Sequence, residues 1–343
     1  MLPLVKPFSK ASDAEKKLLI VAEGFELRTL SALKTLTENV MFERVIICHY
    51  EPSKHSRYNE LLRLVKLHTR KEPIYLKYNR FEPTSFEIEL RSLFTEFNCY
   101  EDVYVDISVM SKLLIMIIIN ELKHFTNTVH LLYSEPVKWG PSKQQYDKAM
   151  SARKEGSAIC LSSVGIGDIV RTPALSSVVM QKNPVVLVAG LSFNEQIVNI
   201  LVNEISPEKL YLINQGCQRD LWREKAIEDI HQDIIEEYRN QKDVIRKFLL
   251  TEYDKVFDYL VDIYKKYWLT NRIIISPTGY KMHAISFALI KICCPDIHVE
   301  YPTPDSYLFD GYSSDEVECI YEIQFESFSD YINRIKENYK LDG

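Results

Sequence analysis

One pattern occurs twice in this chain and limits what the chain can fold into. Residues 273–281, I-I-I-S-P-T-G-Y-K, run from a short apolar stretch through a tight turn to a lysine that opens an amphipathic helix. Residues 103–112, V-Y-V-D-I-S-V-M-S-K, have the same order of strand, hydroxyl-bearing turn, lysine and helix. Such a turn presents backbone N–H groups and a positive charge at a helix N-terminus, which suits a phosphate. The repetition predicts a duplicated fold and a ligand shared between the two copies.

The spacing of the apolar runs supports a duplication. Runs at 18–22 and 45–48 match runs at 185–189 and 210–213, with 23 residues from 22 to 45 and 21 from 189 to 210. The first run of each half is followed by apolar residues at helical spacing. Apolar strands that alternate with helices are typical of parallel sheets covered on both faces. We therefore expect an α/β protein of two Rossmann-like three-layer units with mainly parallel sheets, related by internal duplication as a pseudo-dimer.

The same patterns suggest domain boundaries. We expect a first unit at residues 1–150, a connector at 151–184 and a second unit at 185–343. Residues 220–267 are highly charged and helical in pattern, which favours a solvated helical hairpin or lid, with a partner-binding arm as the alternative. Residues 161–173 of the connector contain two glycines and short β-like runs. This segment is either the domain boundary or a small hairpin.

Composition narrows the possible partners. The net charge of −6 over 343 residues gives no basic footprint for long nucleic acid. The longest apolar run, residues 113–119, is far shorter than a membrane span, and the N-terminal segment does not resemble a signal peptide. The seven cysteines form no C-x-x-C pair, as expected for buried thiols in a reducing compartment. We expect a cytoplasmic protein with no membrane partner, no metal and no cofactor.

Candidate site residues lie after the first and fourth strands of each half. In an open parallel sheet, ligands bind beyond the carboxyl ends of the strands, where the strand order reverses. The candidate ligand-binding residues are Gly190, Ser192, Asn194, Thr278, Gly279, Tyr280 and Lys281 in the second half, and Ser108, Ser111 and Lys112 in the first. A lysine is poorly placed at a helix start against the helix dipole, so its presence in both turns favours a ligand role. Glu23 and Asp106 would repel phosphate unless they face away, so we expect the second half to contribute more of the anion binding.

Structural roles explain some of these residues equally well. Thr278, Ser192 and Asn194 are also expected as helix caps, Gly279 as the relief of a strained turn, and Asp106 as part of an Asx turn. A lone histidine on an apolar helix, such as His283, is more often structural than a ligand. No catalytic residue can be assigned from spacing.

Two of these segments resemble a known family. G-L-S-F-N at 190–194 and S-P-T-G-Y-K-M at 276–282 are similar to motifs of the CRISPR-associated Rossmann fold (CARF) domains, in which a turn rich in Thr and Gly followed by Lys lies on the ligand-binding face. CARF domains dimerise or occur as fused pairs, and they bind cyclic or linear oligonucleotide second messengers. The first half departs from the motif, because V-D-I-S-V-M-S-K lacks the glycine and adds an aspartate.

The resemblance implies a nucleotide-sensing or regulatory protein of a prokaryotic antiviral defence system. It would bind a small anionic nucleotide, such as a cyclic oligonucleotide, and act on a separate effector protein. One alternative is a stand-alone, metal-independent enzyme like the ring nucleases, in which Lys281, Thr278 and Ser111 orient the phosphate of a cyclic oligonucleotide. Another is a structural subunit of a larger complex.

Overall fold

The chain forms two compact units in its computed structural model, which describes residues 2–37, 39–51, 56–96, 99–153, 157–308 and 316–341. The first unit consists of Met1–Lys138 and Ser313–Gly343, and the second of Trp139–Tyr312. This division differs from the expected boundaries at both ends of the second half. Residues 313–343 belong to the first unit because the strand β16 (Val317–Phe325) pairs with β6 (Thr128–Pro136).

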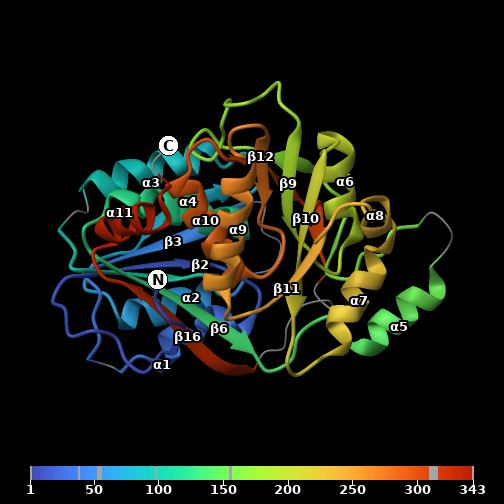
Figure 1. The fold of residues 1–343 in the computed structure, drawn as a ribbon. Coiled ribbons are helices and arrows are strands. Elements are labelled where there is room, and N and C mark those ends of the chain that lie inside the picture. Colours follow the sequence, from blue (N-terminus) through green and yellow to red (C-terminus); the bar gives the residue numbers. More distant parts are fainter. Residues whose placement is uncertain are drawn as a thin grey trace. The chain divides into compact units, whose positions relative to one another are not determined.

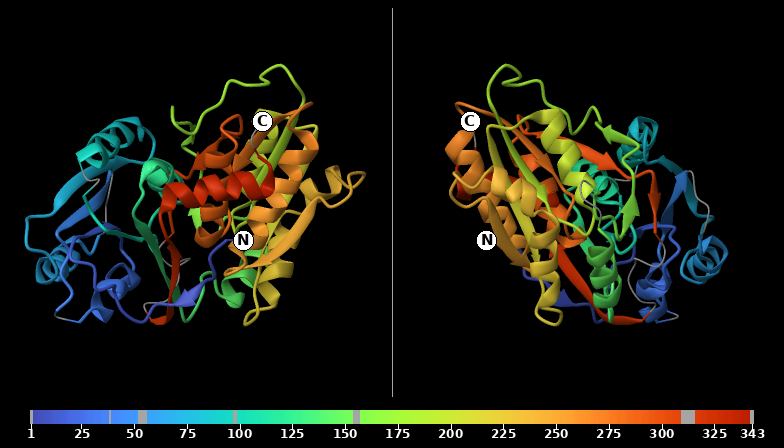
Figure 2. Two further views of the ribbon diagram at one scale, coloured as in Figure 1. Left: turned by 60° about the vertical axis from the view of Figure 1, so that its left-hand side comes forward. Right: turned by 90° about the vertical axis from the view of Figure 1, so that its right-hand side faces the viewer.

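The first unit is built on a seven-stranded sheet in the order β1-β16-β6-β5-β2-β3-β4. Its parallel part contains β6 with β2 (Lys17–Ala22), β3 (Arg44–Glu51), β4 (Ile74–Asn79) and β5 (Asp102–Asp106). The strand β16 is antiparallel to β6, and β1 (Lys6–Pro7) is antiparallel to β16. Figure 2 shows β16 beside β6 at this end of the sheet.

Helices cover both faces of this sheet. In Figure 1, α1 (Ser31–Thr35) and α2 (Tyr58–Leu67) lie on one side, and α3 (Thr84–Glu96) and α4 (Lys112–Glu121) on the other. A short 3₁₀ helix, Leu27–Leu30, leads into α1, another, Leu122–His124, follows α4, and α11 (Phe328–Tyr339) follows β16. The α4 sequence K-L-L-I-M-I-I-I-N-E is apolar nearly all round, and every residue after the lysine is buried. Such a helix is expected where packing surrounds it on all sides.

The second unit is built on a five-stranded, fully parallel sheet in the order β11-β10-β9-β12-β13. The strands are β9 (Val185–Gly190), β10 (Lys209–Gly216), β11 (Ile245–Leu249), β12 (Arg272–Ser276) and β13 (His298–Val299). In Figure 1 the sheet lies between α9 (Tyr253–Tyr267) and α10 (Lys281–Cys293) on one side and α6 (Glu195–Ile205), α7 (Trp222–Ile230) and α8 (Gln232–Glu237) on the other. The remaining helix of this unit is α5 (Lys143–Ala152).

The two units share one strand order. Counted along the chain within each unit, the first parallel strand lies between the second and the fourth, the third lies outside the second, and the fifth lies outside the fourth. The first and fourth strands are β2 and β5 in the first unit, and β9 and β12 in the second. The prediction of an α/β fold with Rossmann-like layers is confirmed, and the common topology is what a duplication would produce.

Two local expectations were wrong. Residues 220–267 are not a helical hairpin or lid, because they contain α7, α8, the edge strand β11 and α9, and β11 is the third strand of the parallel sheet. Residues 161–173 do not form a hairpin with themselves. Their strands β7 (Ser163–Val164) and β8 (Asp168–Val170) pair with β15 (Ser306–Tyr307) and β14 (Tyr301–Thr303), so this segment is part of the second unit.

Candidate functional site

The strand order fixes where a ligand is expected in each unit. Connections from the first and fourth strands leave toward opposite faces of the sheet, and ligands of such folds bind beyond the carboxyl ends of these two strands. In the second unit this place is the end of β9 and the end of β12, which are hydrogen-bonded neighbours. In the first unit it is the end of β2 and the end of β5.

The two predicted loops of the second unit are in direct contact. Gly190 is the last residue of β9, and a Cβ placed on it would lie 2.2 Å from the backbone N of Gly279 and 2.6 Å from its Cα. No side chain fits at that distance, so the close approach requires glycine at position 190. The Thr278 hydroxyl donates a hydrogen bond to the Gly190 carbonyl, which fastens the turn to the strand end. The structure therefore brings Gly190, Thr278 and Gly279 together.

The Thr278 hydroxyl does not cap the helix that follows. The N-cap residue of α10 is Tyr280, which makes no side-chain capping bond. Among the backbone hydrogen bonds of the described residues, none uses the N–H of Met282 or His283. These N–H groups form the positive end of a 13-residue helix whose first residue is the half-buried Lys281. The start of α10 thus combines donors, helix dipole and a lysine, the elements of an anion site.

Asn194 has the predicted capping role. Its Oδ1 accepts from the N–H of Gln196 (3.0 Å), and its Nδ2 donates to the Ser163 hydroxyl (2.7 Å) and carbonyl (3.1 Å). The side chain is fully buried, so it holds the start of α6 against β7. Ser192 is half-buried, and its hydroxyl accepts from the N–H of Asn194 (3.3 Å). The structure gives both side chains a structural task at the exit of β9.

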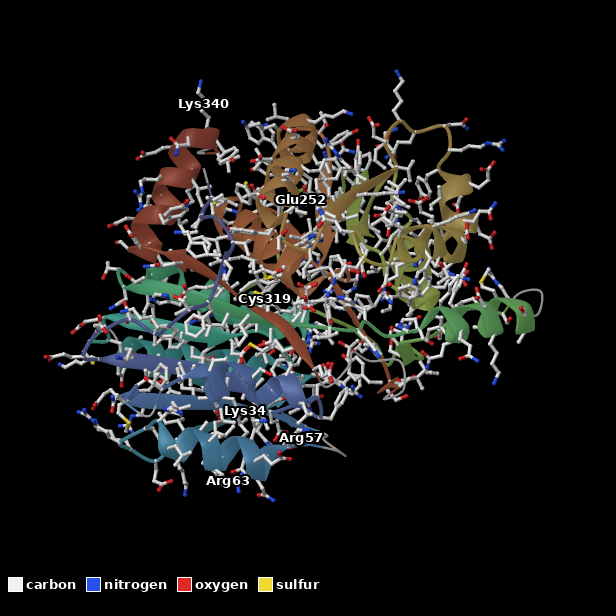
Figure 3. All side chains as sticks on the ribbon, turned by 90° about the horizontal axis from the view of Figure 1, so that it is seen from below. Lys34, Arg57, Arg63, Glu252, Cys319 and Lys340 are labelled. Atoms are coloured by element: carbon white, nitrogen blue, oxygen red, sulfur yellow. The ribbon has the colours of Figure 1, made fainter. Side chains whose placement is uncertain are left out.

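Two buried histidines support the same edge of the sheet. The Nε2 of His231 lies 2.9 Å from the Ser192 carbonyl, and the Nε2 of His283 lies 2.8 Å from the Leu249 carbonyl at the end of β11. Burial lowers the pKa of each imidazole to about 4, so both rings are neutral near pH 7. Each Nε2 then carries the proton that it donates, and each Nδ1 is buried without a hydrogen-bond partner among the described residues. His283 is therefore a structural residue in this fold. The N–H of the same Leu249 donates to the carboxylate of Glu252, which is labelled in Figure 3.

Arg223 is a residue of this edge that the sequence did not reveal. Its guanidinium donates to three backbone carbonyls, those of Trp139 (3.2 Å), Gly140 (2.8 Å) and Pro141 (2.8 Å). It also lies over the ring of Phe193, 4.5 Å from the centroid. The side chain is buried, and this burial lowers its pKa from the usual arginine value. Position 223 falls in the charged segment that indicated a solvated helix, so no local signal distinguished it.

In the first unit both acidic residues of the strand ends are held by neighbouring groups. The buried Glu23 carboxylate accepts from the Tyr50 N–H (3.0 Å) and the Ser56 hydroxyl (3.2 Å), and it pairs with the His49 Nδ1 (2.9 Å). These partners lie at or just after the end of β3, so Glu23 joins the first strand to the second.

The other acidic residue of this unit is held in a turn. The Asp106 carboxylate accepts from the N–H and the hydroxyl of Ser108, which is the anticipated Asx turn. The Ser108 hydroxyl in turn accepts from the Ser134 N–H (2.8 Å). Ser108 is fully buried, so its hydroxyl links the exit of β5 to the neighbouring strand β6.

The lysine turn of the first unit is capped, in contrast to that of the second. The Ser111 hydroxyl accepts from the Leu114 N–H (3.2 Å), and the Ser111 N–H donates to the Tyr50 hydroxyl (2.6 Å). Lys112 makes no ion pair or hydrogen bond with the residues that the structure describes, and desolvation lowers its pKa to about 8. Of the predicted residues in this unit, Lys112 is the one whose charge has no neutralising partner in the described part of the chain.

Arg57 also lies at this edge and was not predicted. Its N–H donates to the Gly24 carbonyl (2.9 Å), and its Nε donates to the Phe25 carbonyl (3.2 Å). The Nη1 of Arg57, which is labelled in Figure 3, pairs with the Glu60 carboxylate at 2.9 Å. Arg57 therefore holds the exit loop of β2 against the start of α2.

The described residues add two general findings. They contain no group of three or more His, Cys, Asp or Glu side chains arranged to hold a metal ion. No helix among them is long and apolar enough to cross a membrane.

Comparison with known proteins gives distant likenesses. One similar solved structure is a Type III CRISPR defence DNA nuclease activated by cyclic oligoadenylate, with a TM-score of 0.47 and 10% sequence identity over 88% of this chain and 67% of the nuclease chain. Another is an NADH-dependent reductase complexed with NAD, with a TM-score of 0.20 and 9% identity over 84% of this chain and 95% of the reductase chain. No family model matches the chain, and neither does any curated protein.

Proposed function

We propose that this protein is a nucleotide sensor that binds a small anionic nucleotide at the carboxyl ends of β9 and β12 in its second unit. The start of α10 carries the proposal. It lacks a side-chain cap, it begins with Lys281, and its turn is fastened to the end of β9 by the contact of Thr278 and Gly279 with Gly190. A phosphate at this place would accept from backbone N–H groups that have no partner among the described residues, and it would complement the helix dipole.

The two hydroxyls that the enzymatic alternative uses are occupied. The Thr278 hydroxyl donates to the Gly190 carbonyl, and the Ser111 hydroxyl caps α4. Hydroxyls that are already hydrogen-bonded within the protein are less available to act on a bound phosphate. This favours binding of the ligand without its cleavage. We therefore favour a receptor over a ring-nuclease-like enzyme.

The ligand to test first is a cyclic oligoadenylate. The motif resemblance at residues 190–194 and 276–282 points to oligonucleotide messengers, and the nuclease with a similar structure is activated by this class of molecule. Lys112, which has no neutralising partner among the described residues, remains the candidate ligand-binding residue of the first unit. A ligand shared between the units, a separate effector protein and a role in antiviral defence are predictions that rest on the sequence.

The experiment is a calorimetric titration of cyclic di-, tri- and tetra-adenylate into wild-type protein and into Lys281→Ala. A hydrogen bond between charged groups contributes about 1.5–3 kcal/mol, so Lys281→Ala should weaken binding by about tenfold or more. The control is Lys225→Ala, which removes an exposed lysine on α7 of the same unit and should leave the affinity unchanged. Equal affinities for the two variants would contradict the proposed site. An absence of binding to wild-type protein would favour the structural-subunit alternative.

A further inference from the structure

A cluster of aromatic side chains adjoins the proposed phosphate position. The ring of Tyr280, the residue before Lys281, lies 5.7 Å from the ring of Trp139 at an angle of 51°. Tyr280 is buried and its hydroxyl donates to the Gly216 carbonyl at the end of β10 (3.3 Å), whereas Trp139 is partly exposed. One large aromatic surface therefore reaches solvent next to the lysine turn.

Hydrogen bonds from Arg223 fix the backbone that carries this aromatic surface. The buried Arg223 donates to the Trp139 carbonyl and to the carbonyls of the next two residues, so the backbone that carries the indole is fixed at three points. The same guanidinium lies over Phe193 from the exit loop of β9. A buried guanidinium is costly to desolvate, and here it is used to fix one short segment of backbone. A ring that is fixed before binding loses little conformational entropy when a flat partner stacks on it.

We infer that Trp139 and Tyr280 form a nucleobase-stacking subsite beside the phosphate position at Lys281. The inference rests on the proposed function, and it specifies a nucleotide that carries its base, rather than a bare phosphate or a sugar phosphate, as the ligand class. A base stacks on an aromatic face independently of hydrogen-bond readout, whereas inorganic phosphate or a sugar phosphate gains nothing from the indole. The phosphate would meet the start of α10 while the base covers Trp139, so the two parts of the ligand would contact adjacent residues of one turn.

The test compares 5′-AMP with ribose 5-phosphate, which share the sugar and the phosphate and differ by the base. Wild-type protein should bind AMP more tightly, and AMP should quench tryptophan fluorescence. Trp139→Ala should weaken AMP binding by about 5-fold to 150-fold, the range typical of base–aromatic stacking, and leave ribose 5-phosphate unaffected. Trp139→Phe keeps a flat ring and should retain most of the AMP affinity, which guards against a general loss of folding.

Two further variants separate this inference from the proposed function. Lys281→Ala should weaken the binding of AMP and of ribose 5-phosphate to the same extent, because it removes a contact to the phosphate that both ligands carry. Trp268→Ala is the matched control, since Trp268 follows α9 before β12 begins and so lies toward the opposite ends of the strands.

The results that would overturn each claim are different. The subsite is refuted if Trp139→Ala changes the two affinities equally or not at all while Lys281→Ala weakens both. The proposed function is refuted if Lys281→Ala changes neither affinity, even where Trp139→Ala weakens AMP. Failure of the wild-type protein to bind AMP would overturn the stacking subsite as stated.

Discussion

The contact between Gly190 and Gly279 makes an asymmetric prediction about two glycines. A Cβ on Gly190 would lie 2.2 Å from the Gly279 nitrogen, whereas a Cβ on Gly279 would lie 3.3 Å from the Gly190 Cα. Ordinary contacts of a Cβ begin at 3.4 Å. Gly190→Ala must therefore push two backbone segments apart by about 1.2 Å (3.4 − 2.2), but Gly279→Ala needs a shift of about 0.1 Å (3.4 − 3.3). Gly279 does not have a left-handed φ, so alanine fits its backbone conformation as well.

The size of the difference follows from these distances. Overpacking of a well-packed site costs about 1–3 kcal/mol, and separation of the loops also strains the bond from the Thr278 hydroxyl, which contributes about 1 kcal/mol. We expect Gly190→Ala to lower the free energy of unfolding of the second unit by about 2–4 kcal/mol. Gly279→Ala should change it by less than about 1 kcal/mol, because the loss of glycine entropy in the unfolded chain offsets a small steric cost.

The chain contains a convenient probe for this measurement. Its three tryptophans, Trp139, Trp222 and Trp268, all lie within the second unit, so their fluorescence in a urea titration follows the unfolding of that unit alone. Circular dichroism recorded in parallel reports on both units. The reasoning from the strand contact would be refuted if Gly190→Ala and Gly279→Ala lowered the free energy of unfolding by amounts that agree within about 0.5 kcal/mol. It would also be refuted if Gly190→Ala left that free energy unchanged.

The two units should respond to pH in opposite directions. Burial lowers the folded-state pKa of His231 and of His283 to about 4, so their contribution to the stability of the second unit is present above pH 6.5 and is lost as the pH falls toward 4. At 1.36 kcal/mol per pKa unit this is about 3 kcal/mol for each histidine, and His283→Gln should flatten the acid decline seen by tryptophan fluorescence; an unchanged slope would contradict it. In the first unit, burial acts to lower the pKa of His130, but Asp102 (3.6 Å) and Glu322 (2.8 Å) outweigh it and raise that pKa. The contribution of His130 to the stability of the first unit is therefore present at pH below about 6.5 and is lost as the pH rises through the folded-state pKa. The difference in urea midpoint between wild type and His130→Gln should accordingly shrink on going to alkaline pH. A difference that stays constant would count against this account.

Much of the fold could be predicted because the central strands are buried on both faces. Such strands appear in the sequence as uninterrupted apolar runs, as in β2, β9 and β12, whose residues are nearly all buried. The edge strands β4 and β11 lack that signal. Their sequences, I-Y-L-K-Y-N and I-R-K-F-L, contain exposed charged residues, and β11 lies within residues 220–267, which were expected to be helical.

The proximity of the two loops of the second unit was predictable from the sequence, but their individual contacts were not. Strand order and turn composition were enough to place Gly190 near the turn that contains Gly279, because both follow from local patterns. The target of the Thr278 hydroxyl and the three carbonyls bound by Arg223 depend on segments that lie far apart in the sequence. A single sequence carries no periodic signal for such contacts.

The connection between the units has a consequence for how the protein is made. Pro136 at the end of β6 and Val317 at the start of β16 are paired neighbours in one antiparallel ladder, and the Val137 N–H donates to the Glu316 carbonyl (3.0 Å). The second unit thus stands where a simple β-hairpin would have its loop. During synthesis, β6 is an unprotected edge until all of the second unit has left the ribosome and β16 arrives. Because β16 follows the second unit along the chain, the first unit can complete its sheet only after the residues of the second unit have been made.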